Sequence, residues 1–329
     1  GFGRECDRGE ADMKPRVSVV VPTFRRPDGL TRALHSIKNQ LLQPDEVIVV
    51  DDNRPGDSYQ RDSLAAARAV GIHELQYMFT GGARGGGAAR NVGIERSSGE
   101  LIAFLDDDDE WLPAKLDRQL ALFASVSPAV GAVYCGHWLV DTEIGTSVAV
   151  EPTLCGNIRE ALLQGKSPAT TSAFVLRRDV LESVGAFDES LSSLQDYDLW
   201  IRVSKNWEFD FVADPLIRFI QHSGSRTSID IERRKKGLFK VLRKMEEQGL
   251  CQNRIRRLRR HFMASAYWKA AVDAIMKNRR LLALRMTFRS VGIQPTDVRK
   301  YKYLLLSLTG RVVLKRCREV YENARSRWN

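Results

Sequence analysis

The sequence has no long hydrophobic run and few cysteines. Among its 329 residues, no uninterrupted apolar stretch approaches the roughly 18 residues that a membrane-spanning helix needs, and residues 1–15 lack the apolar core of a signal peptide. The five cysteines include no C-x-x-C pair, which argues against a disulfide framework or a zinc finger. We therefore expect a cytoplasmic globular protein with reduced thiols.

Charge is unevenly distributed along the chain. The net charge is +10, but residues 231–329 hold 27 Lys or Arg against 7 Asp or Glu, whereas residues 1–230 hold 24 basic and 34 acidic residues. This asymmetry predicts an acidic part able to hold cations and a basic part able to meet a polyanion or an anionic membrane. We expect a flexible segment over 1–15, a main domain over 16–229 and a basic helical region over 230–329.

Short β-branched runs alternate with helical periodicity in the first third of the chain. Strands are predicted over residues 17–21, 46–50, 75–79 and 101–105, and helices over 29–40, 57–70 and 88–97. Such a βαβ series predicts an α/β fold with a mostly parallel central sheet.

The pattern loosens after Trp111. Shorter strands are predicted over 130–135 and 172–176, followed by a helix that begins near Gln195, and from residue 231 onward the periodicity is helical. We expect residues of about 16–111 and of about 112–229 to form the two walls of one cleft.

Five consecutive acidic residues, 106–110, follow the fourth predicted strand. Like charges crowded at a strand end are costly unless a cation offsets them, and Mg²⁺ or Mn²⁺ prefers such carboxylate oxygens. The alternative is that these residues merely begin the next helix, over 113–124, whose positive end favours acidic side chains. That alternative explains one or two carboxylates better than five.

Three further segments each allow two interpretations. Residues 51–53 follow a parallel strand and are either a plain turn or a contact to a nucleotide base. The glycine-rich residues 81–87 lead into a helix, which lets backbone amides and an arginine approach an anion, although they match no Walker or dinucleotide motif. Asp196 is either a helix cap or a general base for an acceptor hydroxyl.

Five segments in order resemble the inverting family 2 glycosyltransferases, which have the GT-A fold. The matches are residues 17–25 (VSVVVPTFR, family VSVVIPTYNR), 49–53 (VVDDN, family VVDDGS), 89–93 (ARNVG, family ARNxG), 106–111 (DDDDEW, family DADDEW) and 196–200 (DYDLW, family EDYDLW). The resemblance spans about residues 16–228. It implies a single displacement with inversion and no covalent enzyme intermediate.

The resemblance also implies roles for individual residues. Pro22, Thr23 and Arg25 would line the nucleotide pocket, and Asp52 would hydrogen-bond the base. Asp106 and Asp108 would be the metal-binding DxD pair, and Asp196 the catalytic base. Further donor contacts are expected for Gly86, Arg90, Asn91 and Asp107, acceptor contacts for Trp111, Gln195 and Trp200, and a contact to the metal or diphosphate for His222.

Two departures from the family pattern affect these roles. Asn53-Arg54-Pro55 replaces the small turn that usually follows the second aspartate, which puts the contacts to the donor base in doubt. Gln195 stands where a glutamate commonly precedes the base, which leaves Asp196 as the sole carboxylate at that position.

The basic C-terminal region also has two interpretations. Its predicted helices carry Arg254, Arg256, Arg257, Arg259 and Arg260 beside Leu and Phe, and such a face is either simply solvated or attracted to an anionic membrane that presents a lipid-linked acceptor. Nucleic acid is disfavoured as a partner because the region has no recognition motif and no interleaved stacking aromatics.

We therefore predict a divalent-metal-dependent, hexosyltransferase-like enzyme. It would move a sugar from a nucleotide sugar, with a UDP-sugar favoured, to a glycan or lipid-linked hydroxyl in bacterial surface oligosaccharide or polysaccharide synthesis. It would work in the cytoplasm or peripherally at the inner face of the cell membrane. The alternatives are a nucleotidyltransferase and a non-catalytic module that binds sugar nucleotides.

Overall fold

A computed structural model describes residues 15–142, 145–221 and 230–297, with residues 301, 303, 304 and 307. The segment expected to be flexible therefore lies almost wholly outside the described residues. The strands are β1 (Val17–Thr23), β2 (Glu46–Asp51), β3 (Leu75–Phe79), β4 (Leu101–Phe104), β5 (Asp109–Trp111), β6 (Val130–Asp141), β7 (Thr146–Val150), β8 (Val175–Arg177) and β9 (Glu208–Gln221).

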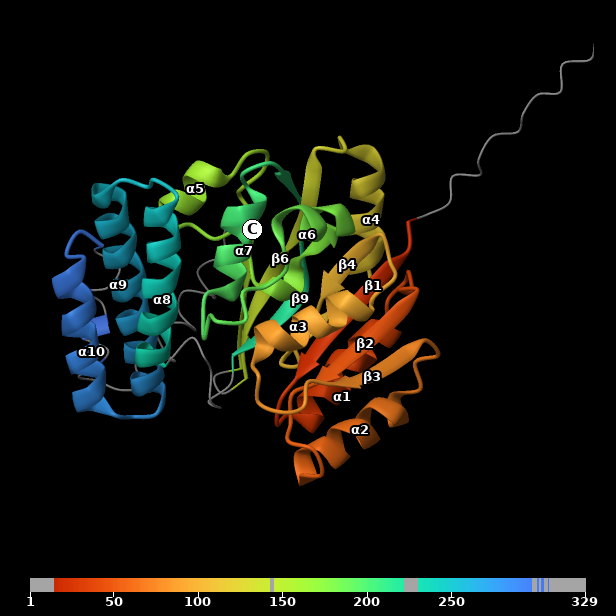
Figure 1. Cartoon of the computed structure of the whole chain (residues 1–329). Helices are drawn as coiled ribbons and strands as arrows, with labels where there is room; N and C mark the ends of the chain where they lie inside the picture. Colours follow the sequence, from red (N-terminus) through yellow and green to blue (C-terminus); the bar gives the residue numbers. More distant parts are fainter. Residues whose placement is uncertain are drawn as a thin grey trace, which may run out of the picture.

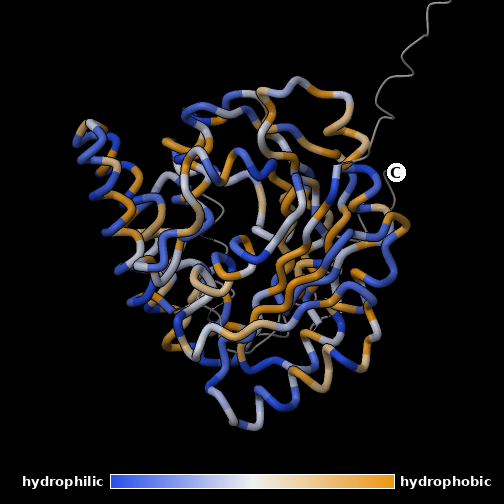
Figure 2. The backbone as a smooth tube through the Cα atoms, turned by 45° about the vertical axis from the view of Figure 1, so that its right-hand side comes forward, coloured by the Kyte–Doolittle hydropathy of each residue, from blue (hydrophilic) through white to orange (hydrophobic). Residues whose placement is uncertain are grey.

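Helices surround this sheet (Figure 1). They are α1 (Pro27–Lys38), α2 (Ser58–Val70), α3 (Gly86–Arg96), α4 (Lys115–Ser125), α5 (Arg159–Leu163), α6 (Arg178–Val184), α7 (Gln195–Val203), α8 (Ile231–Glu247), α9 (Gln252–Met276) and α10 (Arg280–Ile293). Hydrophobic segments gather on the central strands, and hydrophilic ones lie mostly outside them (Figure 2).

Four parallel strands in the order β3-β2-β1-β4 form the first half of the sheet. Val47 and Val49 of β2 belong to the large core that includes α1 and α2, whereas Ile48 and Val50 cluster with Ala89 of α3. Alternate side chains of a strand point to opposite faces, and both faces are covered here, so the strand is apolar at every one of these positions. The expected parallel half and the α/β class are confirmed.

The second half of the sheet is mixed. β8 pairs antiparallel with both β4 and β6, and β6 pairs in parallel with the long β9 through an irregular register near Gly136 and Pro215. The strand expected over 172–176 is partly wrong, because Thr171–Ala173 form a 3₁₀ turn and β8 begins only at Val175. The side chain of Thr170 accepts a hydrogen bond from the Ser172 N–H and favours that turn.

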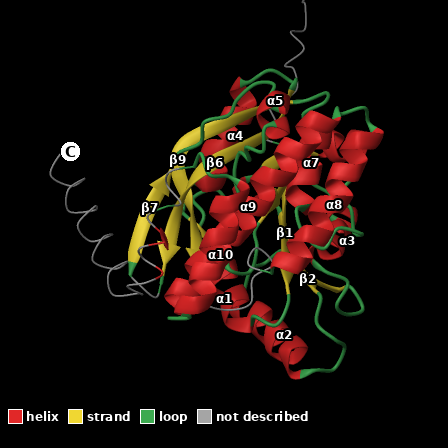
Figure 3. Cartoon of the chain, turned by 90° about the vertical axis from the view of Figure 1, so that its left-hand side faces the viewer, coloured by secondary structure: helices red, strands yellow, loops and turns green. Residues whose placement is uncertain are grey.

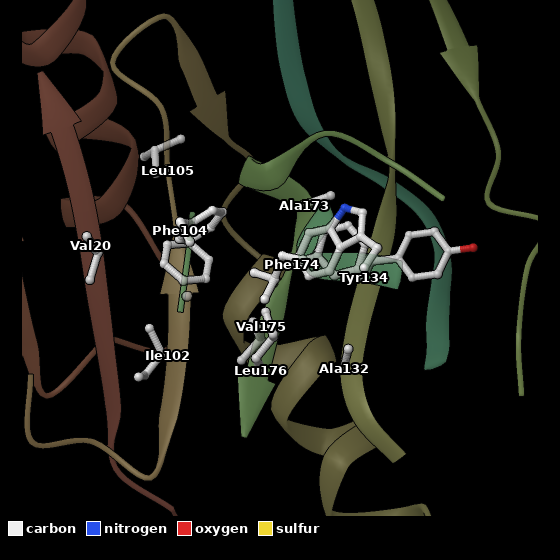
Figure 4. Packing of buried hydrophobic residues seen from close by; sticks show 14 of the residues in the cluster. Val20, Ile102, Phe104, Leu105, Ala132, Tyr134, Ala173, Phe174, Val175 and Leu176 are labelled. Carbon is white, nitrogen blue, oxygen red and sulfur yellow. The ribbon is translucent and has the colours of Figure 1, made fainter. Parts of the chain in front are cut away.

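Aromatic side chains pack together on the second half of the sheet, where Figure 4 labels Tyr134 and Phe174. Phe174 lies between Tyr134 and Trp200, with ring centroids 5.2 and 3.9 Å apart and the rings stacked. Trp200 is fully buried. Its large apolar surface therefore fixes α7 against the sheet.

The basic C-terminal helices share this core. Figures 1 and 3 both show α8 beside α7. Leu238 and Val241 of α8 and Leu258 of α9 belong to the same hydrophobic cluster as the sheet, and Phe262 packs edge-to-face on Tyr197 of α7. Among the helices of the described residues, none combines the length and apolar character that crossing a bilayer requires.

Candidate active site at the carboxyl end of β4

Three carboxylates gather where β4 ends. Asp106, Asp108 and Asp109 each offer an oxygen atom, and these atoms lie within 4.8 Å of one another. Arg90 of α3 forms an ion pair with Asp106, and the Arg26 Nη1 atom lies 3.2 Å from Asp108. The expected cluster therefore forms, and arginines from two other elements balance its charge.

Asp107 points differently from its neighbours. Its Oδ2 accepts hydrogen bonds from Thr23 Oγ1 at 2.9 Å and from the Phe24 N–H at 3.1 Å, and its Oδ1 accepts one from Arg26 at 2.9 Å. Burial, with a contribution from Asp108, raises the pKa of Asp107 to about 6 although Arg26 opposes this shift. Asp107 thus joins β4 to the turn after β1.

That turn holds Arg25 in the left-handed region, at φ 57°. The Arg25 N–H donates to Asn53 Oδ1 at 2.9 Å, which stabilises a conformation that a non-glycine residue rarely adopts. The Arg25 guanidinium lies 5.0 Å from the ring centre of Phe24 and 5.7 Å from that of Tyr59. Sequence spacing did not reveal Tyr59, because its approach to Arg25 depends on the packing of α2.

Asp109 is the buried member of the cluster, and Ser172 holds it in place. Ser172 Oγ donates to Asp109 Oδ2 at 2.6 Å and accepts from the Asp106 N–H at 3.1 Å. Trp111, expected to contact the acceptor, is buried, and its indole N–H donates to the Ser172 carbonyl at 3.0 Å. A ring in this position supports the site by packing, and Ser172 is a participant that sequence spacing did not reveal.

Asp52 holds the glycine-rich loop. Its carboxylate accepts hydrogen bonds from the backbone N–H groups of Arg84 at 2.8 Å and Gly85 at 2.7 Å and from Thr80 Oγ1. Gly85 has φ 97°, so the loop needs a residue without a Cβ there. Both oxygens of Asp52 are engaged in this way, and its contact to a nucleotide base stays a prediction.

The N-terminus of α3 lies between the acidic cluster and α7. A Cβ on Gly86 would lie 3.1 Å from Arg90 Nη1, and one on Gly87 would lie 2.9 Å from Gln195 Nε2, so both glycines permit close approach. Asn91, for which a donor contact was expected, binds the backbone of Phe187: its side chain donates to the Phe187 carbonyl at 2.8 Å and accepts from the Phe187 N–H at 2.9 Å.

Gln195 and Asp196 begin α7 beside this helix. Gln195 Nε2 donates to the Leu191 carbonyl at 2.7 Å, and Asp196 is partly exposed. Trp200, also expected to contact the acceptor, lies in the core described above. His222 lies outside the described residues.

Sequence comparisons identify relatives of this chain. A model of glycosyl transferase family 2 matches residues 18–185, about half of the chain. An uncharacterized glycosyltransferase of Rickettsia prowazekii is 27% identical over 219 residues, which cover 65% of this chain and 66% of that protein, slightly under two thirds of its length. The amylovoran biosynthesis glycosyltransferase AmsB of Erwinia amylovora is 28% identical over 208 residues, covering 61% and 68%.

Solved structures share the fold. S. aureus TarS 1-349 in complex with UDP-GlcNAc superposes with a TM-score of 0.58 at 16% identity, covering 84% of this chain and 81% of that one. The mannosyltransferase PcManGT from Pyrobaculum calidifontis, in complex with GDP-Man and Mn²⁺, gives a TM-score of 0.55 at 19% identity, covering 91% and 87%. At these identities the likeness concerns the fold.

Proposed function

This chain belongs to glycosyl transferase family 2 and has the GT-A fold, and from that premise we propose that it transfers a sugar from a nucleoside-diphosphate sugar to a hydroxyl acceptor with inversion at the anomeric carbon. The observation that carries the proposal is the group of carboxylates formed by Asp106, Asp108 and Asp109 at the end of β4. The ligands UDP-GlcNAc and GDP-Man in the structural neighbours support a nucleotide-sugar donor, and a UDP-sugar is our first choice.

The residues at the end of β4 fit a divalent cation. Asp106 and Asp108 would hold Mn²⁺ or Mg²⁺, since hard cations take carboxylate oxygens and these oxygens already converge. The bound ion would stabilise the negative charge of the departing nucleoside diphosphate. Arg26 and Arg90 lie against the same carboxylates, so their positive charges would help to neutralise the departing diphosphate.

Asp196 of α7 would complete the reaction. The acceptor oxygen would bond to the anomeric carbon as the bond from that carbon to the diphosphate oxygen breaks, with its electron pair leaving on the diphosphate. Asp196 would take the proton of the acceptor hydroxyl. Pro22, Thr23 and Arg25 would line the donor pocket, and residues 16–111 would then be the donor half and 112–229 the acceptor half.

Asp108→Asn and Asp196→Asn test this assignment. With UDP-GlcNAc or GDP-mannose and Mn²⁺, Asp108→Asn should abolish metal-dependent release of nucleoside diphosphate, whereas Asp196→Asn should lose transfer and keep donor affinity. The product's anomeric configuration, read by NMR, reports inversion. Pyrophosphate exchange in place of nucleoside diphosphate release would favour a nucleotidyltransferase, and full transfer by Asp196→Asn would remove the proposed base.

A membrane-bound or glycan acceptor in bacterial surface polysaccharide synthesis completes the proposal, and the name of AmsB supports that pathway class.

The basic C-terminal helices would supply the membrane contact. Part of their charge is used internally, since Arg254 pairs with Glu160. On the outer face of α10, in contrast, Leu281 and Phe288 are 85% and 62% exposed beside the exposed Arg285 and Arg289. Apolar and cationic side chains together suit an anionic bilayer surface.

Co-sedimentation with vesicles tests the membrane contact. The protein should bind phosphatidylglycerol-rich vesicles at low salt more strongly than phosphatidylcholine vesicles, and Leu281→Ser with Phe288→Ser should weaken that binding. Equal binding to both vesicle types would contradict the electrostatic contribution.

A further inference from the structure

The segment that leads into Asp196 is held from two sides. On the donor side, Asn91 of α3 binds the Phe187 backbone, and Arg84 of the glycine-rich loop forms an ion pair with Glu189 at 2.8 Å. The chain then turns through residues 188–194, and Leu194 takes a left-handed conformation, φ 61°, directly before α7. A turn strained at that residue needs outside contacts to keep one conformation.

Helix α8 supplies those contacts from the other side. Arg233 Nε donates to the Ser192 carbonyl at 2.8 Å, and Lys240 Nζ donates to the Ser190 carbonyl at 2.6 Å. The hydroxyls of Ser192 and Ser193 each donate to the Arg233 carbonyl at 3.2 Å. The turn therefore has its backbone and side-chain polar groups bound to one face of α8.

Gly237 allows α8 to lie directly on this turn. A Cβ there would lie 2.5 Å from the Ser193 carbonyl oxygen and would collide with Ser193 Oγ. Glycine in a helix costs about 1 kcal/mol relative to alanine. Gly237 thus lowers the intrinsic stability of α8 but lets the helix backbone lie against Ser193 of the turn.

Lys244, one helical turn after Lys240, adds a further contact between α8 and the turn. Its Nζ lies 2.5 Å from Asp188 Oδ2 and 2.8 Å from Asp198 Oδ1, so a single ammonium joins the start of the turn to α7. Asp198 is buried and also pairs with Arg202 at 3.0 Å. Buried charges held this way fix geometry because leaving one unpaired is costly.

We propose that α8 is a positioning element of the active site: by docking on residues 188–194 it sets the position of Asp196 and couples the basic C-terminal region to sugar transfer. This inference rests on the proposed role of Asp196. Burial lowers the pKa of Arg234 of α8, and the negative charge of Asp196 opposes that shift, so α8 also places a cation within electrostatic range of the proposed base. The basic region thereby acts on chemistry as well as on any membrane contact.

Gly237→Ala tests the inference, with Gly292→Ala of α10 as the matched control. Both substitutions favour a helix, but a Cβ at Gly292 meets nothing within 4 Å. With UDP-GlcNAc or GDP-mannose and Mn²⁺, Gly237→Ala should slow turnover by about tenfold or more, because small displacements of a reacting group cost that much, and should leave donor affinity unchanged. Gly292→Ala should match the wild type in both.

A double-mutant comparison and an activity-independent measurement complete the test. If α8 acts through Asp196, adding Gly237→Ala to Asp196→Asn should lower the small remaining turnover of that variant little further. Amide hydrogen exchange in residues 188–197 should rise in Gly237→Ala and stay unchanged in Gly292→Ala. Wild-type turnover by a folded Gly237→Ala protein, or unchanged exchange in that segment, would overturn the inference.

Lys240→Met gives the same readouts if Gly237→Ala does not fold, since Lys240 is exposed and its loss removes only the bond to Ser190. The exposed Lys236 of the same helix supplies its control, Lys236→Met. If the wild type turns over neither sugar nucleotide, the proposed function fails, while hydrogen exchange still decides whether α8 holds the turn.

Discussion

Lys115 offers a quantitative test of how the core beneath the active site is built. It is the first residue of α4 and fully buried, and its Nζ has no hydrogen-bond acceptor within the described part of the chain. That atom lies 3.9 Å from the ring centre of Trp111. At this residue, therefore, the free-energy cost of burying a charged ammonium opposes the attraction of that ammonium to the face of an aromatic ring.

The cost can be worked out from the pKa of the ammonium. Burial lowers the pKa of Lys115 from 10.5 to about 8, and a shift of this size corresponds to about 3 kcal/mol against the folded state at pH 7. A desolvated contact with Trp returns about 2 kcal/mol. Methionine keeps the apolar stem and a favourable sulfur contact with the ring, so Lys115→Met should stabilise the protein by about 1–2 kcal/mol.

Urea unfolding of both proteins from pH 7 to pH 10 measures this difference. The folded pKa lies below the unfolded one, so the unfolded state binds more protons between about pH 8 and 10.5, and wild-type stability should rise with pH there. The advantage of Lys115→Met should shrink accordingly, whereas Arg118→Met, on the exposed side of α4, should show little pH dependence. A variant less stable than the wild type at pH 7, or a constant difference across this range, would refute the reasoning.

Two further predictions concern packing and acid stability. Gly93→Ala should destabilise the fold by about 1–3 kcal/mol in urea unfolding, because the new Cβ would overlap the side chain of Val20, and Val20→Ala should restore part of the loss; an unchanged midpoint would show that α3 can shift freely. Burial raises the pKa of Asp188, but hydrogen bonds from Lys244 and Ser190 outweigh this and lower it to about 2, so the ionised form stabilises the fold above the unfolded pKa and this contribution is lost as the pH falls through about 2. Solvent screens this partly exposed ion pair, so Asp188→Asn should cost about 1 kcal/mol from pH 5 to 8 and progressively less below pH 4, and a cost that persists at pH 2 would contradict the ion pair.

The sequence predicts the parallel half of the sheet well for a physical reason. Strands buried on both faces are apolar at every position, as in residues 47–50. The change to polar residues directly after such a run shows where the strand ends. β9 escaped prediction because Asp210, Asp214 and Arg218 interrupt it and Pro215 breaks its pattern. Its pairing with β6 depends on an irregular register that no local pattern encodes.

The site shows the same division. The acidic cluster was predicted because charge density at one strand end is visible in the sequence itself. The supporting roles of Asp52 and Asn91, which hold backbone segments, depend on contacts across 28 to 96 residues and could not be read from spacing. The docking of α8 was missed because a cationic helix looks solvated until its partners, such as Ser190 and Asp188, are placed beside it.

The shared core of α8, α9 and the sheet limits how this protein can be truncated or joined to foreign segments. A fragment ending at residue 229 would expose an apolar surface, because Leu238, Val241 and Leu258 cover apolar side chains from earlier in the chain. An exposed apolar surface of this kind favours self-association of the shortened polypeptide. A chimera with a foreign C-terminal region would need to reproduce the apolar face of these helices as well as their positive charge.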